Sequence, residues 1–209
     1  CGNDAPALIS FTSGTTGGCK AALRTHGLLL SQHRAIEQNL ALVPGEVELV
    51  ALPIFVLANL ASRVTSIIPS VDLRNPSMIT PAPVVTQIQS CDATRTAAPP
   101  AFYERIVDHC ERHQLTLPGL TKIHTGGGPV PTRLLHRLQH IAPRAAITIV
   151  YGSTEAEPIS KVSLGEMEVS DHRAMLEGRG LLAGRPVPSI ELRIMKDQWG
   201  WTIGPCDRK

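Results

Sequence analysis

Residues 10–20, SFTSGTTGGCK, combine glycines, hydroxyl side chains and a lysine in one short segment. Glycine lets backbone N–H groups approach an anion closely, and hydroxyl groups add further hydrogen-bond donors. The hydroxyl groups belong to Thr12, Ser13, Thr15 and Thr16, and the segment closes with Lys20. Side chains of this kind at this spacing predict a loop that holds phosphate.

The segment departs from two well-known phosphate-binding patterns. A P-loop reads G-x-x-x-x-G-K-[ST], but counting from Gly14 places Cys19 at the second glycine and Ala21 at the hydroxyl. These two departures disfavour a P-loop NTPase. No G-x-G-x-x-G opens a helix, which disfavours a dinucleotide-binding fold. Hydroxyl groups before and inside the loop instead suit a loop that wraps a polyphosphate from the side.

The elements around this loop alternate between strands and helices. Strands are predicted at 7–12, 20–24, 49–55, 93–97, 120–124 and 146–150, and helices at 28–43, 56–64, 81–91, 101–114 and 132–141. Short strands and turns are expected from residue 160, closing with 190–195. Such alternation predicts an α/β fold, with a mostly parallel sheet covered by helices on both faces.

Three glycine-rich segments follow predicted strands, at 13–18, 126–128 and 152. In open parallel sheets, ligands bind outside the carboxyl ends of the strands. A single glycine pair is more often a tight turn. Three such segments in one sheet, one of them flanked by hydroxyl groups and a lysine, favour a ligand site.

Composition narrows the class of ligand. The 209 residues carry a formal net charge of +2 and only 3% aromatic side chains, which gives no reason to expect nucleic acid or a membrane surface as partner. The five cysteines are scattered, as expected for free thiols in a reducing cytosol. The longest apolar run, 50–61, is too short for a transmembrane helix. We therefore expect a cytoplasmic protein with small-molecule ligands; its oligomeric state is open.

Five segments together resemble the AMP-forming adenylating superfamily, which includes acyl-CoA synthetases, nonribosomal peptide adenylation domains and luciferases. The first is FTSGTTGGCK at 11–20, which is similar to the superfamily's [YF]-T-S-G-[ST]-T-G-x-P-K loop. The others are LPIF at 52–55, TGGGP at 125–129, YGSTE at 151–155 and GRPVP at 184–188. They occur in the family's order over almost the whole chain, which makes the resemblance specific.

The resemblance implies ATP and Mg²⁺ as ligands and a role for each motif residue. The β- and γ-phosphates of ATP would be held by Thr12, Ser13, Gly14, Thr15, Thr16, Gly17 and Lys20. The adenine pocket and the turn beside it would consist of Gly127, Gly128, Pro129, Tyr151, Gly152 and Ser153, with Tyr151 stacked on the base. Thr154 would bind the α-phosphate and Glu155 the magnesium ion, so that Lys20, Thr154 and Glu155 carry the chemistry.

Each role has a structural alternative. Tyr151 taken alone reads as a core aromatic, Glu155 as a solvated loop acid and Lys20 as a surface lysine. His124, just before a glycine turn, is a further candidate for lining the substrate pocket.

The sequence also departs from the family. Cys19 stands where proline is usual, and Val56 stands where an aromatic or histidine often follows LPxF, which suggests an apolar acyl tunnel. No Y-x-T-G-D segment follows Ile194. We therefore expect residues 1–209 to form part of the large N-terminal adenylation domain, without the small C-terminal domain and its catalytic lysine.

The substrate and acceptor are less sharply indicated. The segment 65–76 is similar to long-chain acyl branches, including the β-lactone synthetases of olefin synthesis, which favours a fatty or β-hydroxy-fatty acid. CoA, a carrier protein or an intramolecular lactone could take the acyl group. Two alternatives remain: a truncated, inactive nucleotide-binding fragment, and a phosphate-binding regulatory module unrelated to ligases.

Overall fold

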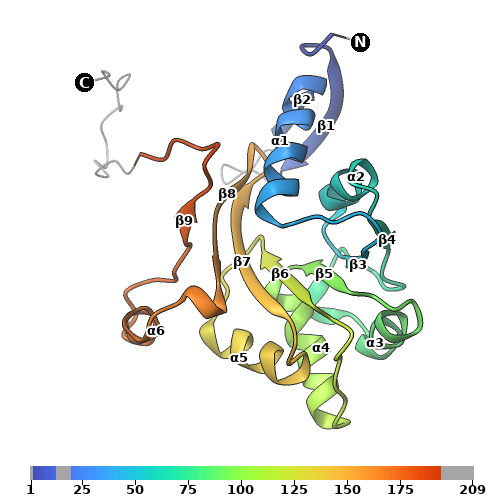
Figure 1. Cartoon of the computed structure of the whole chain (residues 1–209), viewed down its shortest axis with the longest axis vertical. Helices are drawn as coiled ribbons and strands as arrows, with labels where there is room; N and C mark the ends of the chain where they lie inside the picture. The colour runs from blue at the N-terminus through green and yellow to red at the C-terminus, as the bar shows by residue number, and fades with distance from the viewer. Residues whose placement is uncertain (1, 13–19, 194–209) are drawn as a thin grey trace.

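A seven-stranded sheet forms the centre of the computed structural model, which describes residues 2–12 and 20–193. The strand order is β4-β3-β5-β6-β7-β8-β9; the pairs from β4 to β7 are parallel, and β8 and β9 run antiparallel (Figure 1). The strands span Val47–Val50 (β3), Thr65–Ile67 (β4), Arg95–Ala98 (β5), Lys122–Gly126 (β6), Ala146–Ser153 (β7), Ala156–Ser163 (β8) and Arg185–Pro186 (β9).

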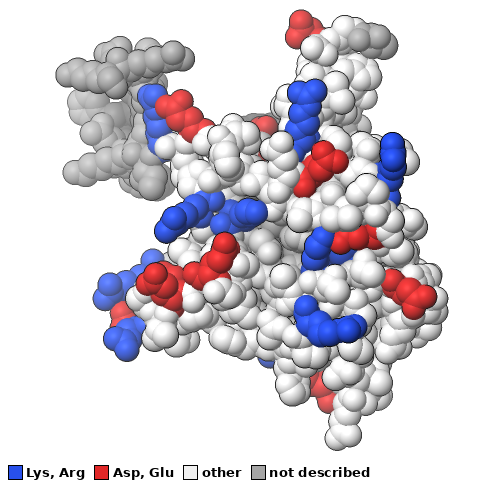
Figure 2. Space-filling model, in the orientation of Figure 1, with Lys and Arg blue, Asp and Glu red and all other residues white. Residues whose placement is uncertain are grey.

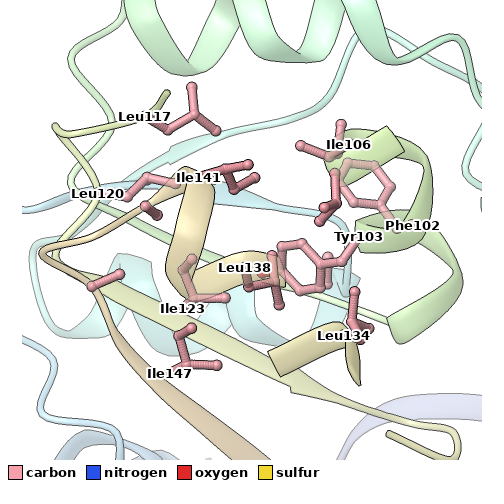
Figure 3. Close-up of a cluster of buried hydrophobic side chains, with 14 of the residues drawn as sticks. Phe102, Tyr103, Ile106, Leu117, Leu120, Ile123, Leu134, Leu138, Ile141 and Ile147 are labelled. Carbon is pink, nitrogen blue, oxygen red and sulfur yellow. The ribbon is translucent and has the colours of Figure 1, made fainter. Parts of the chain in front are cut away.

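Helices cover both faces of the sheet, as predicted. On one face lie α1 (His26–Asn39) and α2 (Pro53–Ala61), which share a small apolar cluster with β3, β5 and β7. On the other lie α3 (Pro81–Ser90), α4 (Pro100–Arg112) and α5 (Thr132–Ile141), over the larger core shown in Figure 3. The α/β prediction with a mostly parallel sheet is therefore confirmed.

Helix α5 illustrates why these sequences form these elements. Its buried residues Leu134, Leu138 and Ile141 recur at spacings that place them on one helical face, and each is at most 1% exposed. They meet the apolar face of α4, where Phe102 and Tyr103 lie edge to face with ring centroids 6.0 Å apart (Figure 3). This helical layer packs against one face of β6 and β7.

Three local predictions are wrong. The apolar run 49–55 is not one strand, because β3 ends at Val50 and Pro53 opens α2, where its fixed φ favours the first helical turn. Helix α6 (Val169–Leu176) was not expected; it has no buried residue and hence no apolar stripe to reveal it. In the segment 190–195, residues 190–193 form no strand, and 194 and 195 lie outside the described residues.

The first glycine segment does not follow a strand of the main sheet, which corrects the expectation of three such segments in one sheet. Strands β1 (Pro6–Thr12) and β2 (Lys20–Thr25) pair only with each other, as a separate antiparallel hairpin beside α1 (Figure 1). Neighbouring strands joined by a short connection close readily into a hairpin, whereas joining a parallel sheet requires a long crossover.

Cys91 and Cys110 are free thiols, and Cys1, Cys19 and Cys206 lie outside the described residues. On the face shown in Figure 2, acidic and basic side chains are interspersed. No helix in the described part of the chain is long and apolar enough to cross a membrane.

Candidate active site

A pocket of about 550 Å³ opens at the carboxyl ends of β6 and β7. Its lining includes Gly127, Gly128, Pro129 and Tyr151, the residues predicted for the adenine pocket, together with Gly152 but not Ser153. Two motifs that lie far apart in the sequence are brought together because β6 and β7 are parallel neighbours, so that their carboxyl ends meet at one edge.

Two glycines give this edge its shape. A Cβ on Gly126 would lie 2.1 Å from the carbonyl oxygen of Val150, so only glycine allows the end of β6 to pack so closely on β7. Gly127 has φ +74°, in the left-handed region, and a Cβ built there meets no atom within 4 Å. Because Gly127 has no side chain, its backbone is accessible from the pocket, and a flat ligand could approach it closely.

Tyr151 provides an aromatic wall. The two preceding residues of β7, Ile149 and Val150, are buried, whereas Tyr151 is 52% exposed at the pocket. That exposure excludes the alternative that Tyr151 is a core aromatic. A half-exposed ring fixed on a buried strand is suited to stack against a planar group.

Sequence reasoning missed an apolar part of the pocket lining. It consists of Leu181, Leu182 and Ala183, in the irregular segment between α6 and β9. These side chains give the pocket an apolar side. Their segment has neither a motif nor a helical or strand period, so no local signal marked them.

The β7–β8 turn adjoins the pocket through Gly152 and carries the remaining motif residues. Ser153 pairs with Ala156 across the turn, and Thr154 and Glu155 form its tip. Glu155 is exposed, which places a carboxylate within reach of solvent next to the pocket. Thr154 is part-buried, and its backbone carbonyl accepts a hydrogen bond from Nη2 of Arg24.

Two of the predicted phosphate-loop residues, Thr12 and Lys20, lie at the end of the hairpin. They are the last pair in the β1–β2 register. Ser13, Gly14, Thr15, Thr16 and Gly17 lie outside the described residues. The structure therefore places the backbone ends of this loop, on an element separate from the main sheet.

The described residues contain no group of three or more histidine, cysteine or acidic side chains that could enclose a metal ion. Magnesium does not require such a group, since it is commonly held by one or two carboxylates together with phosphate oxygens and water. The exposed carboxylate of Glu155, at the turn beside the pocket, fits this mode of binding.

His124 does not line this pocket. It is 5% exposed within β6, and its backbone carbonyl accepts a hydrogen bond of 3.1 Å from the hydroxyl of Tyr103. Burial lowers the pKa of His124 to about 3, assisted by the positive charges of Arg95, Lys122 and Lys161. The imidazole is therefore neutral at physiological pH.

The sequence is similar to those of known synthetases and ligases. The chain is 30% identical over 191 residues to an olefin beta-lactone synthetase of Stenotrophomonas maltophilia (90% of this chain, 34% of that protein). It is 27% identical to the putative acyl–CoA ligase YdaB of Bacillus subtilis (91% and 36%). The chain thus spans about a third of the length of these curated relatives.

Among solved structures, the fold is similar to that of O-succinylbenzoate coenzyme A synthetase (MenE) from Bacillus subtilis, in complex with ATP and magnesium ion. The TM-score is 0.71 at 23% identity, covering 94% of this chain and 38% of that one. The family model described as "AMP-binding enzyme" matches residues 1–204. Since this model covers almost the whole chain, the chain belongs to the AMP-binding enzyme family.

Proposed function

We propose that this chain takes part in the ATP-dependent activation of a carboxylic acid, giving an acyl-adenylate and pyrophosphate. The observation that carries the proposal is the convergence of Gly127–Pro129, Tyr151 and Gly152 in one pocket beside the Thr154–Glu155 turn. Membership of the AMP-binding family and the acyl–CoA ligase name of the YdaB relative support the same reaction class.

Each residue would contribute through position and charge. The Tyr151 ring stacks on adenine, against the bare backbone of Gly127 and Gly128. The Thr154 hydroxyl donates to the α-phosphate, and the Lys20 ammonium neutralises the distal phosphates. Holding the carboxylate and the phosphorus in line, with donors fixed where negative charge develops, supplies the rate enhancement.

Glu155 would hold Mg²⁺ with one carboxylate. When bound, the ion neutralises phosphate charge in the transition state. A turn exposed to solvent allows the ion to retain water ligands, as magnesium usually does.

We further propose that the acid is apolar, a fatty or β-hydroxy-fatty acid, and that CoA or another acceptor takes the acyl group. The similarity to an olefin beta-lactone synthetase supports a fatty substrate, and the YdaB relative supports CoA. Val56, the residue from which an apolar acyl tunnel was predicted, packs partly buried on the apolar cluster between α1, α2 and the sheet.

The first test is nucleotide binding followed by exchange. Calorimetry with ATP, AMP and GTP comes first, and labelled pyrophosphate exchange is then screened in the native protein with fatty acids of different length. Absence of ATP binding would refute the proposal. ATP binding without exchange for any acid would instead support the alternative, a nucleotide-binding fragment.

Glu155→Gln tests the metal role in the same assay. The substitution preserves shape but removes the charge that magnesium prefers, so exchange should fall steeply and recover partly at raised magnesium. Glu177→Gln is the matched control, since Glu177 is also an exposed carboxylate but pairs with Arg179 and does not line the pocket. Equal activity of the Glu155 and Glu177 variants would remove Glu155 from the metal site.

A further inference from the structure

Arg24 is the one buried residue of the β1–β2 hairpin among those described. Its exposed fraction is 4%, whereas its neighbour Leu23 is 55% exposed, as is Ile9 on the partner strand. A guanidinium is among the most costly groups to bury, because it loses its water and keeps its charge. A charge buried in an otherwise exposed hairpin must therefore be held by specific contacts.

The guanidinium is held by two neutral acceptors on different elements. Nη1 donates to Oε1 of Gln32 in α1 at 2.8 Å, and Nη2 donates to the backbone carbonyl of Thr154 in the β7–β8 turn. Nε is buried without a hydrogen-bond partner in the described structure. Arg24 thus uses the fork of its side chain to join β2, α1 and the turn.

The carboxyl group of Glu157 is influenced by the charge of Arg24. Burial raises the pKa of Glu157, at the start of β8, and the charge of Arg24 opposes that rise. Glu157 also packs on the turn, since a Cβ on Gly152 would lie 3.0 Å from its Cγ. No ion pair between Arg24 and a carboxylate occurs in the described ranges 2–12 and 20–193, so the charge of Arg24 acts on Glu157 without a direct ion pair.

The Arg24–Thr154 contact connects two elements that carry candidate site residues. Strand β2 begins at Lys20, and the turn presents Thr154 and Glu155. The backbone hydrogen bonds that join the hairpin to other described elements reach only α1, from His26 and Gly27. The Arg24–Thr154 contact is a hydrogen bond that ties the hairpin directly to the turn.

We propose that Arg24 is a positioning residue that sets the spacing between the strand carrying Lys20 and the turn carrying Thr154 and Glu155. This inference rests on the proposed function, in which one polyphosphate spans that gap. Arg24 itself does not touch the nucleotide. It acts through the turn backbone, and the fork of the guanidinium is needed because two acceptors on two elements must be engaged together.

The test compares Arg24→Gln and Arg24→Lys with Arg144→Gln. Arg144 also donates to a backbone carbonyl, that of Pro118 at 2.7 Å from Nε, but is remote from the hairpin. Hydrogen exchange without nucleotide is measured first. Arg24→Gln should speed exchange in peptides covering 20–25 and 150–158, Arg24→Lys should do so less, and Arg144→Gln should leave both peptides unchanged.

Nucleotide affinity is measured next on the same proteins. Arg24→Gln should weaken ATP by up to about 10- to 150-fold, the loss expected when the charge-assisted hydrogen bond from Lys20 is no longer made, and AMP by a clearly smaller factor. A purely stabilising arginine would instead lower the unfolding temperature and weaken ATP and AMP alike. Unchanged exchange at 150–158, or equal losses for ATP and AMP, overturns the proposal.

Two safeguards keep the outcome decisive. If Arg24→Gln does not fold, Arg24→Lys, which keeps the charge, decides by the same two readouts. If the unsubstituted protein binds no ATP, the proposed function fails. The hydrogen-exchange experiment still tests whether Arg24 connects the hairpin to the β7–β8 turn. If the unsubstituted protein binds ATP and both Arg24 variants show normal hydrogen exchange, only the role of Arg24 is overturned.

Discussion

The pocket edge of the main sheet and the β1–β2 hairpin carry the two halves of the candidate site, and they are built in opposite ways. The pocket edge lies on strands packed between two helical layers, with Phe102 fully buried below it. The hairpin has Phe11 72% exposed and Leu23 55% exposed, and buries Arg24 alone among its described residues.

The two regions therefore depend on different contacts: core packing forms the pocket, and surface contacts position the hairpin. The half proposed to bind adenine is fixed by the same packing that stabilises the domain, so we expect it to be present whenever the protein is folded. The half that starts at Lys20 depends on how a small hairpin sits on α1 and the β7–β8 turn. Perturbing the first region should affect stability, and perturbing the second should affect ligand binding with little effect on stability.

The largest expected effect comes from truncating one phenylalanine in each region. Phe102→Ala should lower the free energy of unfolding by about 3–5 kcal/mol, because it leaves a cavity in a close-packed core. Phe11→Ala should change it by less than about 0.5 kcal/mol. Chemical denaturation measures both. Similar losses for the two variants would mean that the hairpin is as tightly packed as the sheet.

Next in size is Lys20→Ala, which tests the hairpin half. Removing a charge-assisted hydrogen bond of about 1.5–3 kcal/mol should weaken ATP roughly 10- to 150-fold. AMP lacks the distal phosphates, so its affinity should hardly change. Calorimetry with both nucleotides gives the ratio; parallel losses for ATP and AMP would show that Lys20 acts elsewhere.

Tyr151→Ala tests the other half and should give the contrasting pattern. Stacking of a base on an aromatic ring contributes about 1–3 kcal/mol, and ATP and AMP share the base. Both nucleotides should therefore weaken by the same factor, while Tyr151→Phe, which keeps the ring, should bind nearly normally. A loss confined to ATP would contradict the stacking role.

The smallest effect concerns acid stability beneath the pocket. The folded pKa of His124, about 3, lies below its unfolded value of 6.5, so the unfolded state binds more protons between these values and stability falls as pH falls. From pH 7 to 5.5, His124 should account for a loss of about 1.3 kcal/mol. In His124→Gln that part of the pH dependence should disappear, whereas exposed His113→Gln should retain it.

Local patterns predicted the parts of the fold whose neighbours in space are also neighbours in sequence. The predicted bounds of α5, 132–141, agree with the structure, because its leucines mark one helical face. Strand β7 was placed from the apolar run 146–150, although it extends to Ser153. Segments without a period, such as α6 and the pocket-lining segment 181–183, were not found.

The sequence by itself indicated the family and predicted a chemistry for its motifs, because glycine, hydroxyl and acidic residues at fixed spacings carry that information along the chain. Only the tertiary structure decided that β1 and β2 stand apart from the main sheet, and that Gly127 and Tyr151 share a pocket with Leu182. Only it showed Arg24 buried between Gln32 and Thr154. These are contacts between residues far apart in the sequence, and packing in three dimensions selects them, whereas hydrophobic period and turn chemistry act over a few neighbouring residues.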